Sequence, residues 1–393
     1  MENVSSSNGL EKYPKLRFPG FDEPWKLYKA EDLFRNVTDK NHADETVLTI
    51  IQGRGTMPRE QAGRNIHYDD KSLSGYKRTE RGDFIIHLRS FEGGLEMANE
   101  TGIVSPAYTI LRCNKPHSSL FYNAYFHTDE FINHVLAKSV EGIRDGRQIS
   151  YEAFKWLGIP YCCPAEQAKI HGLFETLDLK IDKQRQLVDS LKKYKRGLLR
   201  ATFSQEVHLS NSATWKRRKF REIASLRRAK YTPSRADSRI CVELEHIEQQ
   251  TGRLINYVDS AEQNSIKSVF KQGDVLFGKL RPYLRKYCLP QFDGVCSSEI
   301  WVLVPETCVV SEYLFYLVQS DEFLAAANIS SGTKMPRAEW SKVSNEDYFI
   351  PLISEQKRIA RMLSIVDHRI TTASEMLSTL ERMRKSFLQQ IFI

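Results

Sequence analysis

The sequence EQAKIHGLFETLDLKIDKQRQLVDSLKKYKRGLLRATF, residues 166–203, recurs without a gap as EQKRIARMLSIVDHRITTASEMLSTLERMRKSFLQQIF, residues 355–392. Glu166 matches Glu355 and Phe203 matches Phe392, so the offset is 189 residues at both ends. Self-similarity at a fixed offset indicates a duplicated structural unit, and it governs how every other segment is interpreted.

Each copy has the pattern of one long helix with an apolar seam. Apolar residues recur at alternating steps of three and four, which is typical of a coiled coil, and no internal proline interrupts either copy. Lys195 and Arg384 break the two seams at the same repeat position. About 30 helical residues form a rod of about 45 Å, and neither rod can bury its stripe alone. We therefore expect the helices to pack as an antiparallel coiled coil, and we assign the helix-pair and subunit interface to Leu177, Ile181, Val188, Leu191, Val366, Ile370, Leu377 and Leu380.

The segments that precede the two helices are also related. The matching residues are Trp25 and Trp215, Gly82-Asp83 and Gly273-Asp274, Leu88-Arg89 and Leu280-Arg281, Leu120-Phe121-Tyr122 and Leu314-Phe315-Tyr316, and Asp129-Glu130-Phe131 and Asp321-Glu322-Phe323. The predicted fold class is α+β, with two pseudo-symmetric globular domains that are each followed by a long helix. We divide the chain into a first globular domain (residues 1–160), a first helix (161–206), a second globular domain (207–350) and a second helix (351–393).

The composition favours a nucleic-acid partner and excludes several classes of protein. The 393 residues are 41% hydrophobic and carry a formal net charge of +8. No apolar run approaches the roughly 18 residues of a membrane span, and the N-terminus lacks the features of a secretory signal. Seven scattered cysteines indicate neither a disulfide framework nor a zinc site. These features are typical of a cytoplasmic protein, and the positive charge favours a polyanionic partner.

No catalytic motif stands out in the sequence. Residues 273–279 have the G-x-x-x-x-G-K spacing of a phosphate-binding loop, but Leu280 follows where a Ser or Thr must bind magnesium. The residues between the two glycines are typical of a strand. The histidines show no metal-ligand spacing, so we expect no metal. Glu243 and Glu245 alternate as on a strand, without a nuclease-type lysine. We predict a binding protein.

The segment Lys279-Leu280-Arg281-Pro282-Tyr283-Leu284-Arg285-Lys286-Tyr287 is the strongest candidate for a nucleic-acid contact. Arginine can bind guanine edges or phosphates, and lysine neutralises phosphates. Pro282 restricts the backbone of the loop. The alternative is an ordinary solvated basic loop. Further candidate contacts are Lys334 and Arg337 in the second half, and Arg54, Arg64, Arg89 and Arg147 in the first.

Together these segments resemble the DNA-specificity subunit of type I restriction-modification systems, over essentially the whole chain. The similar segments are residues 14–21 with Trp25, residues 273–284, Ser331-Gly332-Thr333, and residues 350–360. The first half departs from the pattern, because Leu88-Arg89-Ser90 lacks the proline and tyrosine that follow Arg281.

The resemblance implies a non-catalytic reader of DNA. Each globular domain would be a target-recognition domain for one half of a bipartite duplex site, and the helix pair would act as a spacer. The helices would dock two methyltransferase subunits, which carry S-adenosylmethionine, and two restriction subunits, which use ATP and magnesium; this chain would bind no cofactor itself. Two other interpretations stay open: a stand-alone DNA methyltransferase or nuclease with an unrecognised motif, and a basic coiled-coil scaffold.

Overall fold

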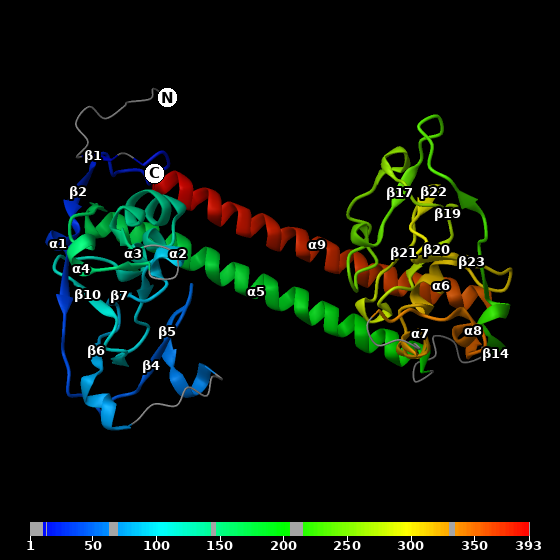
Figure 1. Ribbon diagram of the computed structural model, residues 1–393, viewed down its shortest axis with the longest axis horizontal. Helices are drawn as coiled ribbons and strands as arrows, with labels where there is room; N and C mark the ends of the chain where they lie inside the picture. The colour runs from blue at the N-terminus through cyan, green and yellow to red at the C-terminus, as the bar shows by residue number, and fades with distance from the viewer. Residues whose placement is uncertain are drawn as a thin grey trace. The chain divides into compact units, whose positions relative to one another are not determined.

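The computed structural model describes residues 11–12, 14–62, 70–142, 147–204, 215–329 and 335–392 (Figure 1). The chain forms two compact units: unit 1 comprises Met1–Lys183 and Met376–Ile393, and unit 2 comprises Gln184–Glu375. None of the helices in the described ranges combines the length and the apolar character of a membrane span. The four-part division predicted from the sequence stays a prediction.

Unit 1 is built around an antiparallel sheet in the order β3-β10-β7-β8. Its strands are β3 (Phe34–Val37), β10 (Thr109–Cys113), β7 (Phe84–Ile86) and β8 (Glu96–Met97). Strand β2 (Trp25–Lys29) pairs with β1 (Glu11–Lys12) and β13 (Gly158–Tyr161). Smaller pairs are β4 (Leu48–Ile51) with β5 (Gly55–Pro58), β6 (Lys77–Thr79) with β9 (Gly102–Val104), and β11 (Val140–Glu141) with β12 (Gln148–Ile149). The short helices are α1 (Ala30–Leu33), α2 (Ser90–Gly93), α3 (Ser119–Phe126) and α4 (Tyr151–Phe154).

Unit 2 repeats the four-stranded sheet of unit 1. The sheet β15-β23-β20-β21 consists of β15 (Ala224–Leu226), β23 (Ile300–Pro305), β20 (Val275–Gly278) and β21 (Tyr287–Cys288). Strand β14 (Lys216–Lys219) pairs with β24 (Asp347–Ile350) as β2 pairs with β13. A further sheet consists of β16 (Lys230–Tyr231), β19 (Lys267–Phe270), β22 (Gly294–Cys296), β17 (Ile240–Val242) and β18 (Val258–Asp259). The helices are α6 (Ser311–Leu317), α7 (Asp321–Asn328) and α8 (Trp340–Val343).

The two predicted long helices are α5 (Pro164–Phe203) and α9 (Ile353–Ile391), and each contributes residues to both units. In unit 2, Gln184 Nε2 donates to the Ala373 carbonyl at 2.9 Å, and Lys195 Nζ lies 2.6 Å from Asp367. The residue numbers of the α9 partners decrease as those of α5 increase, so the two helices are antiparallel. The prediction of an α+β fold with two related globular parts and an antiparallel helix pair is confirmed.

None of the eight residues assigned to the helix interface is exposed, and their role as an interface stays a prediction. Leu177, Ile181, Val188 and Val366 are buried, whereas Leu191, Ile370, Leu377 and Leu380 are half-buried. The polar residues that break the seams form ion pairs: Lys195 with Asp367 in unit 2, and Arg384 with Asp178, at 2.5 Å, in unit 1. Both members of these pairs correspond at the 189-residue offset, so each unit builds the same contact.

A buried glutamine joins the start of each long helix to its unit. Gln167 Oε1 accepts a hydrogen bond from the Ser118 amide at 2.8 Å, and Gln356 Oε1 accepts one from the Val310 amide at 3.0 Å. Both glutamines are fully buried. Satisfying these buried polar groups requires both partners at fixed positions, which accounts for a glutamine at the same place in both copies of the repeat.

The structure corrects one detail of the repeat alignment. Phe121 packs on Phe392 with ring centroids 5.2 Å apart, and Tyr313 packs on Phe203 at 5.6 Å. Phe121 therefore corresponds to Tyr313, and the sequence match of Leu120-Phe121-Tyr122 with Leu314-Phe315-Tyr316 is wrong by two residues. A shift of two positions turns a helix by about 200°, so the sequence match would place the wrong face against the long helices.

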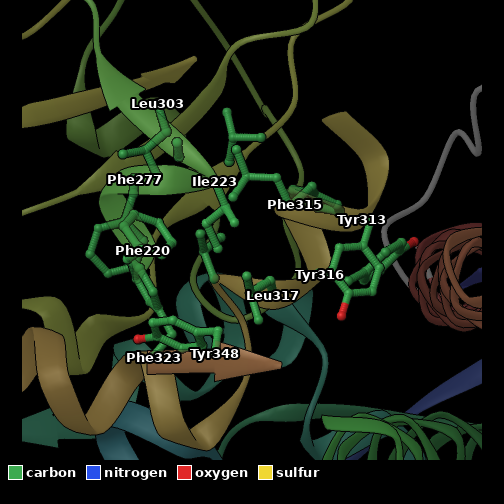
Figure 2. Close-up of a cluster of buried hydrophobic side chains, with 14 of the residues drawn as sticks. Phe220, Ile223, Phe277, Leu303, Tyr313, Phe315, Tyr316, Leu317, Phe323 and Tyr348 are labelled. Atoms are coloured by element: carbon green, nitrogen blue, oxygen red, sulfur yellow. The ribbon is translucent and has the colours of Figure 1, made fainter. Parts of the chain in front are cut away.

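The core of unit 2 lies between its main sheet and its helices (Figure 2). Phe220 and Phe277 both pack edge-on or tilted against Phe323, with ring centroids 5.1 Å apart in each case, and Leu303 of β23 is fully buried beside them. Apolar burial of this kind contributes about 25 cal/mol per Å². The core thereby anchors β20, whose C-terminal end carries the candidate contact loop.

Candidate nucleic-acid interface

The candidate loop of unit 2 leaves β20 at Gly278 and forms one 3₁₀ turn, Pro282–Leu284. Arg281 and Arg285 flank this turn with φ values of 51° and 52°, in the left-handed region. Non-glycine residues in that region cost on the order of 1–3 kcal/mol each, so the surrounding contacts must stabilise them. Residues 275–278, within the segment that has the spacing of a phosphate-binding loop, form strand β20.

A second candidate segment stabilises this turn. The Arg281 amide donates to the Pro336 carbonyl and the Ala338 amide donates to the Lys279 carbonyl, both at 2.8 Å. Leu280 and Arg337 form an isolated antiparallel bridge. The structure therefore brings together two segments more than 50 residues apart in the sequence, as a single basic edge. We call Lys279–Lys286 with Arg337 the unit 2 basic edge.

Arg281 and Tyr283 are exposed side chains of the unit 2 basic edge, Tyr283 by 53%. Among the described residues, the Arg281 guanidinium has no hydrogen bond or ion pair. Arg337 makes two hydrogen bonds to the Glu299 carboxylate, at 3.0 and 3.2 Å, and these bonds lower the pKa of Glu299. Arg281 is therefore the cation most available to a ligand.

Two other predicted residues support the turn. Lys286 Nζ donates to the Leu244 carbonyl at 2.6 Å, and burial lowers the pKa of its ammonium group. Lys279 is half-buried at the beginning of the turn. Two predicted contacts, Lys334 and Arg64, lie outside the described residues.

Unit 1 assembles its predicted arginines in a comparable way. Arg89 precedes α2, is 68% exposed and lies 2.6 Å from Glu92. The Arg147 guanidinium lies 4.4 Å from the centroid of the Phe91 ring, in the same short helix. Arg54 is exposed at the tip of the β4–β5 hairpin, and Gln52 of this hairpin lies directly against Gly93. We call Arg54, Arg89 and Arg147 the unit 1 basic edge.

The sequence did not reveal the residue that fixes this hairpin. Glu96 is fully buried and accepts hydrogen bonds from the Gly53 and Gly55 amides at 2.6 and 2.8 Å. His127 Nε2 lies 3.3 Å from the same carboxylate. Although burial alone would raise it, the pKa of Glu96 is lowered by these hydrogen bonds. An acidic residue in a short strand gives no sequence signal of such a role.

A repeated ion pair fixes the turn before each central strand. Asp83 accepts two hydrogen bonds from Arg112 of β10, at 2.9 and 2.7 Å. Asp274 accepts two from Arg227, at 2.6 and 2.8 Å, although Arg227 follows β15. The carboxylates match between the halves, whereas the arginines come from different strands, which is why the sequence comparison detected only the Gly-Asp pairs.

The surroundings of Glu243 differ from the sequence prediction. Lys267 Nζ lies 2.5 Å from Glu243, so a lysine does accompany this carboxylate, contrary to the sequence prediction. Lys267 is almost completely buried, as expected of a structural ion pair. Within the described ranges, no group of three or more His, Cys, Asp or Glu side chains could hold a metal ion.

Comparisons with known proteins agree with this architecture. Residues 213–382 match the family model "Type I restriction modification DNA specificity domain". The chain is 25% identical over 191 residues to the type I restriction enzyme EcoDI specificity subunit of Escherichia coli, covering 47% of this chain and 42% of that protein. It is 28% identical over 135 residues to the HindI specificity subunit of Haemophilus influenzae, covering 32% and 29%. Each match thus covers less than half of the curated relative.

Solved structures share the fold over nearly the full chain. The HsdS subunit from Thermoanaerobacter tengcongensis matches with a TM-score of 0.51 at 16% identity, covering 97% of this chain and 98% of that one. The type I restriction-modification S subunit from M. genitalium matches with a TM-score of 0.55 at 13% identity, covering 97% and 99%.

The duplicated topology and the paired long helices define a fold that this chain shares with these solved structures. Residues 213–382 therefore match the type I restriction-modification DNA specificity domain, and the chain is similar to the specificity subunits named above.

Proposed function

We propose that this chain is the sequence-specific duplex-DNA recognition subunit of a type I restriction-modification complex. The observation that carries the proposal is the duplicated basic edge. Each unit presents exposed arginines on a short turn after its central strand: Arg281 after β20, and Arg89 after β7. Two such edges in one chain are suited to a bipartite site, of which each unit reads one half.

Arginine is the residue best suited to this chemistry. Its planar guanidinium can donate two parallel hydrogen bonds to guanine O6 and N7. Arg281 is exposed, and its guanidinium has no polar partner among the described residues, so we assign base contact to Arg281. The remaining predicted residues, in both basic edges, are proposed to contact phosphates or to support the turns.

We also propose that exposed apolar residues on α5 and α9 dock the methyltransferase subunits. Leu187 and Tyr194 of α5 are 47% and 58% exposed, and Met376 and Met383 of α9 are 51% and 42% exposed. The two pairs correspond at the 189-residue offset, and one pair belongs to each unit. A spacing of seven residues places both members of a pair on one helix face. Two equivalent patches are suited to two copies of one partner.

In this proposal, the chain itself catalyses no reaction. S-adenosylmethionine would bind to the methyltransferase subunits, and ATP and magnesium to two restriction subunits. The cytoplasmic location expected from the sequence also stays a prediction.

Selection from random duplex DNA tests the proposal. The full chain, with a methyltransferase subunit, should enrich two short fixed sequences separated by unspecified bases. Enrichment of no sequence would favour the basic scaffold. DNA turnover by the purified chain alone, with magnesium and S-adenosylmethionine, would favour a stand-alone enzyme.

A further inference from the structure

Unit 2 contains a cavity of about 180 Å³ between its segments of α5 and α9 and two loops of its globular part. The cations that line it are Lys192, Lys195, Arg196, Arg253 and Arg285. The only carboxylates among its lining residues are Glu248 and Asp367. Positive charge is therefore in excess at this cavity.

Both carboxylates are already engaged by neighbours. Asp367 lies 2.6 Å from Lys195 and accepts a hydrogen bond from the Tyr316 hydroxyl at 2.9 Å. Glu248 accepts a hydrogen bond from Thr251 at 2.8 Å and lies 4.0 Å from Arg253. Asp367 therefore neutralises Lys195, and Glu248 forms only a long ion pair with Arg253, so the two carboxylates do not balance the other cations of the cavity.

Two cations of the cavity have no counter-charge within the described ranges, and a third has only a long ion pair. Lys192 and Arg196 are exposed, lie one helical turn apart on α5, and make no hydrogen bond or ion pair within the described ranges. Arg285 approaches Asp321 only to 3.7 Å, and that carboxylate is 64% exposed. Three cations around one opening match a phosphate group, whose oxygens accept charge-assisted hydrogen bonds from several donors at once.

Two residues that line the cavity have unusual backbone conformations. Gln250 and Arg285 both line the cavity, both have positive φ values (64° and 52°), and the Gln250 amide donates to the Arg285 carbonyl at 2.9 Å. Strained residues held by their surroundings cluster at binding sites. Both residues line the same cavity as Lys192 and Arg196 of α5.

We propose that this cavity binds a backbone phosphate of the bound duplex, a proposal that rests on the proposed function. Arg285 belongs both to the cavity and to the turn that carries Arg281. A strand whose base contacts Arg281 would therefore pass close to the opening of the cavity. Lys192 and Arg196 are open to solvent and can receive a phosphate from a large ligand without any rearrangement.

The test compares two double variants of the full chain. Lys192→Ala with Arg196→Ala removes the two unpaired cations of α5. Lys193→Ala with Arg200→Ala is the matched control, because both residues are exposed on the same helix and neither lines the cavity. Affinity is measured over a range of salt concentrations, for the selected site and for a scrambled duplex. Far-UV circular dichroism checks that both variants fold.

The cavity variant should bind both duplexes about 10-fold more weakly, because charged hydrogen bonds are lost. The slope of log affinity against log salt should fall by about 1, as expected for the loss of one phosphate contact. The ratio of affinities for the two duplexes should not change, whereas the control variant should resemble the wild type.

Other outcomes overturn the proposal in distinguishable ways. If the wild type prefers the selected site and the cavity variant keeps the wild-type salt slope, the inference fails while the proposed function stands. If the wild type prefers no sequence, the proposed function fails first. If inorganic phosphate or ATP binds the wild type but not the cavity variant, and DNA affinity is unchanged, the site serves a free anion.

Discussion

Individual side chains of the two basic edges differ in how freely they can meet a ligand. Arg281 has no polar partner among the described residues, whereas Arg337 is bound to Glu299 and Arg89 lies close to Glu92. An arginine that is already paired must first lose that contact, and exposed pairs are worth about 0–1 kcal/mol. Arg281 can therefore contact a ligand without first breaking an ion pair.

We predict that Arg281→Ala relaxes one half-site and leaves the other unchanged. The loss of discrimination should be about 1–3 kcal/mol if the contact is to a base. Alanine at a φ of 51° is as strained as arginine, so the substitution isolates the side chain. Selection from random duplexes measures the effect. Arg281→Lys, which keeps the charge but loses the planar fork, should retain more affinity than discrimination; unaltered preference in both variants would remove the assignment.

The pair of Glu96 and His127 makes unit 1 sensitive to pH. Burial opposes the charged form of His127, but its hydrogen bonds to the Glu96 carboxylate and the Asn123 carbonyl raise its pKa above the ordinary value. A raised pKa means that the folded state binds the proton more tightly than the unfolded state. The resulting stability is fully present below about pH 6.5 and is lost as the pH rises through the folded-state pKa.

We predict that His127→Gln removes this pH-dependent component. Glutamine is the residue at the corresponding position 319 of unit 2, so the substitution introduces the side chain that the other unit uses. Urea unfolding at pH 5.5 and at pH 8.5 measures the effect. The wild type should lose more stability than the variant between these values; equal losses would show that the Glu96 contact is not coupled to folding.

At the scale of elements, the two ion pairs of the helix interface are matched in sequence but not in burial. Lys195 is 7% exposed and Asp367 is 24% exposed, whereas Arg384 and Asp178 are 35% and 47% exposed. A buried charge that loses its partner is strongly destabilising, and an exposed pair contributes little. Lys195 also donates to Gln319 at 2.9 Å, so its position is fixed twice.

We predict that Asp367→Ala destabilises the chain by about 2–3 kcal/mol, somewhat below the cost for a fully buried pair. Asp178→Ala, the repeat-matched control, should cost about 0–1 kcal/mol. Urea unfolding followed by far-UV circular dichroism compares the two. A double variant with Lys195→Met should recover much of the loss, because it removes the unpaired charge. Equal effects of the two aspartates would contradict the burial argument.

The exposed apolar pairs on α5 and α9 provide a second prediction at this scale. Leu187→Asp with Tyr194→Asp should abolish docking of one methyltransferase subunit, and Met376→Asp with Met383→Asp should abolish docking of the other. The measurement is the stoichiometry of the complex by native mass spectrometry. Leu179→Asp is the control, because Leu179 is 55% exposed but corresponds to His368 in the repeat. Full stoichiometry in both double variants would exclude these patches.

At the scale of the whole molecule, the two ends of the described chain meet in one core. Phe392 is fully buried in unit 1, with ring centroids 6.0 Å from Trp25 and 5.2 Å from Phe121. Arg17, near the N-terminus, makes two hydrogen bonds to Glu166 at the start of α5. Unit 1 is therefore completed only when residues from both ends of the sequence are present.

We predict that Phe392→Ala destabilises unit 1 by about 3–5 kcal/mol, because it leaves a cavity among aromatic rings. Unit 2 should be unaffected. Hydrogen exchange, resolved by segment, should show lost protection in β2 and α3 and unchanged protection in β20 and β23. Phe203→Ala, the repeat-matched change in unit 2, should have a smaller effect there because Phe203 is only half-buried. Uniform loss across both units would contradict this division.

Sequence periodicity by itself determined the two long helices, their mutual packing and the tandem of related globular parts. Helical and strand periods are local consequences of backbone geometry, and an apolar stripe on residues 166–203 can be buried only by a second stripe. The tertiary structure alone decided that Phe121 corresponds to Tyr313, that Arg281 lies beside Arg337, and that Lys192 and Arg196 share a cavity with Arg285. These contacts depend on loops of unequal length, which sequence spacing does not constrain.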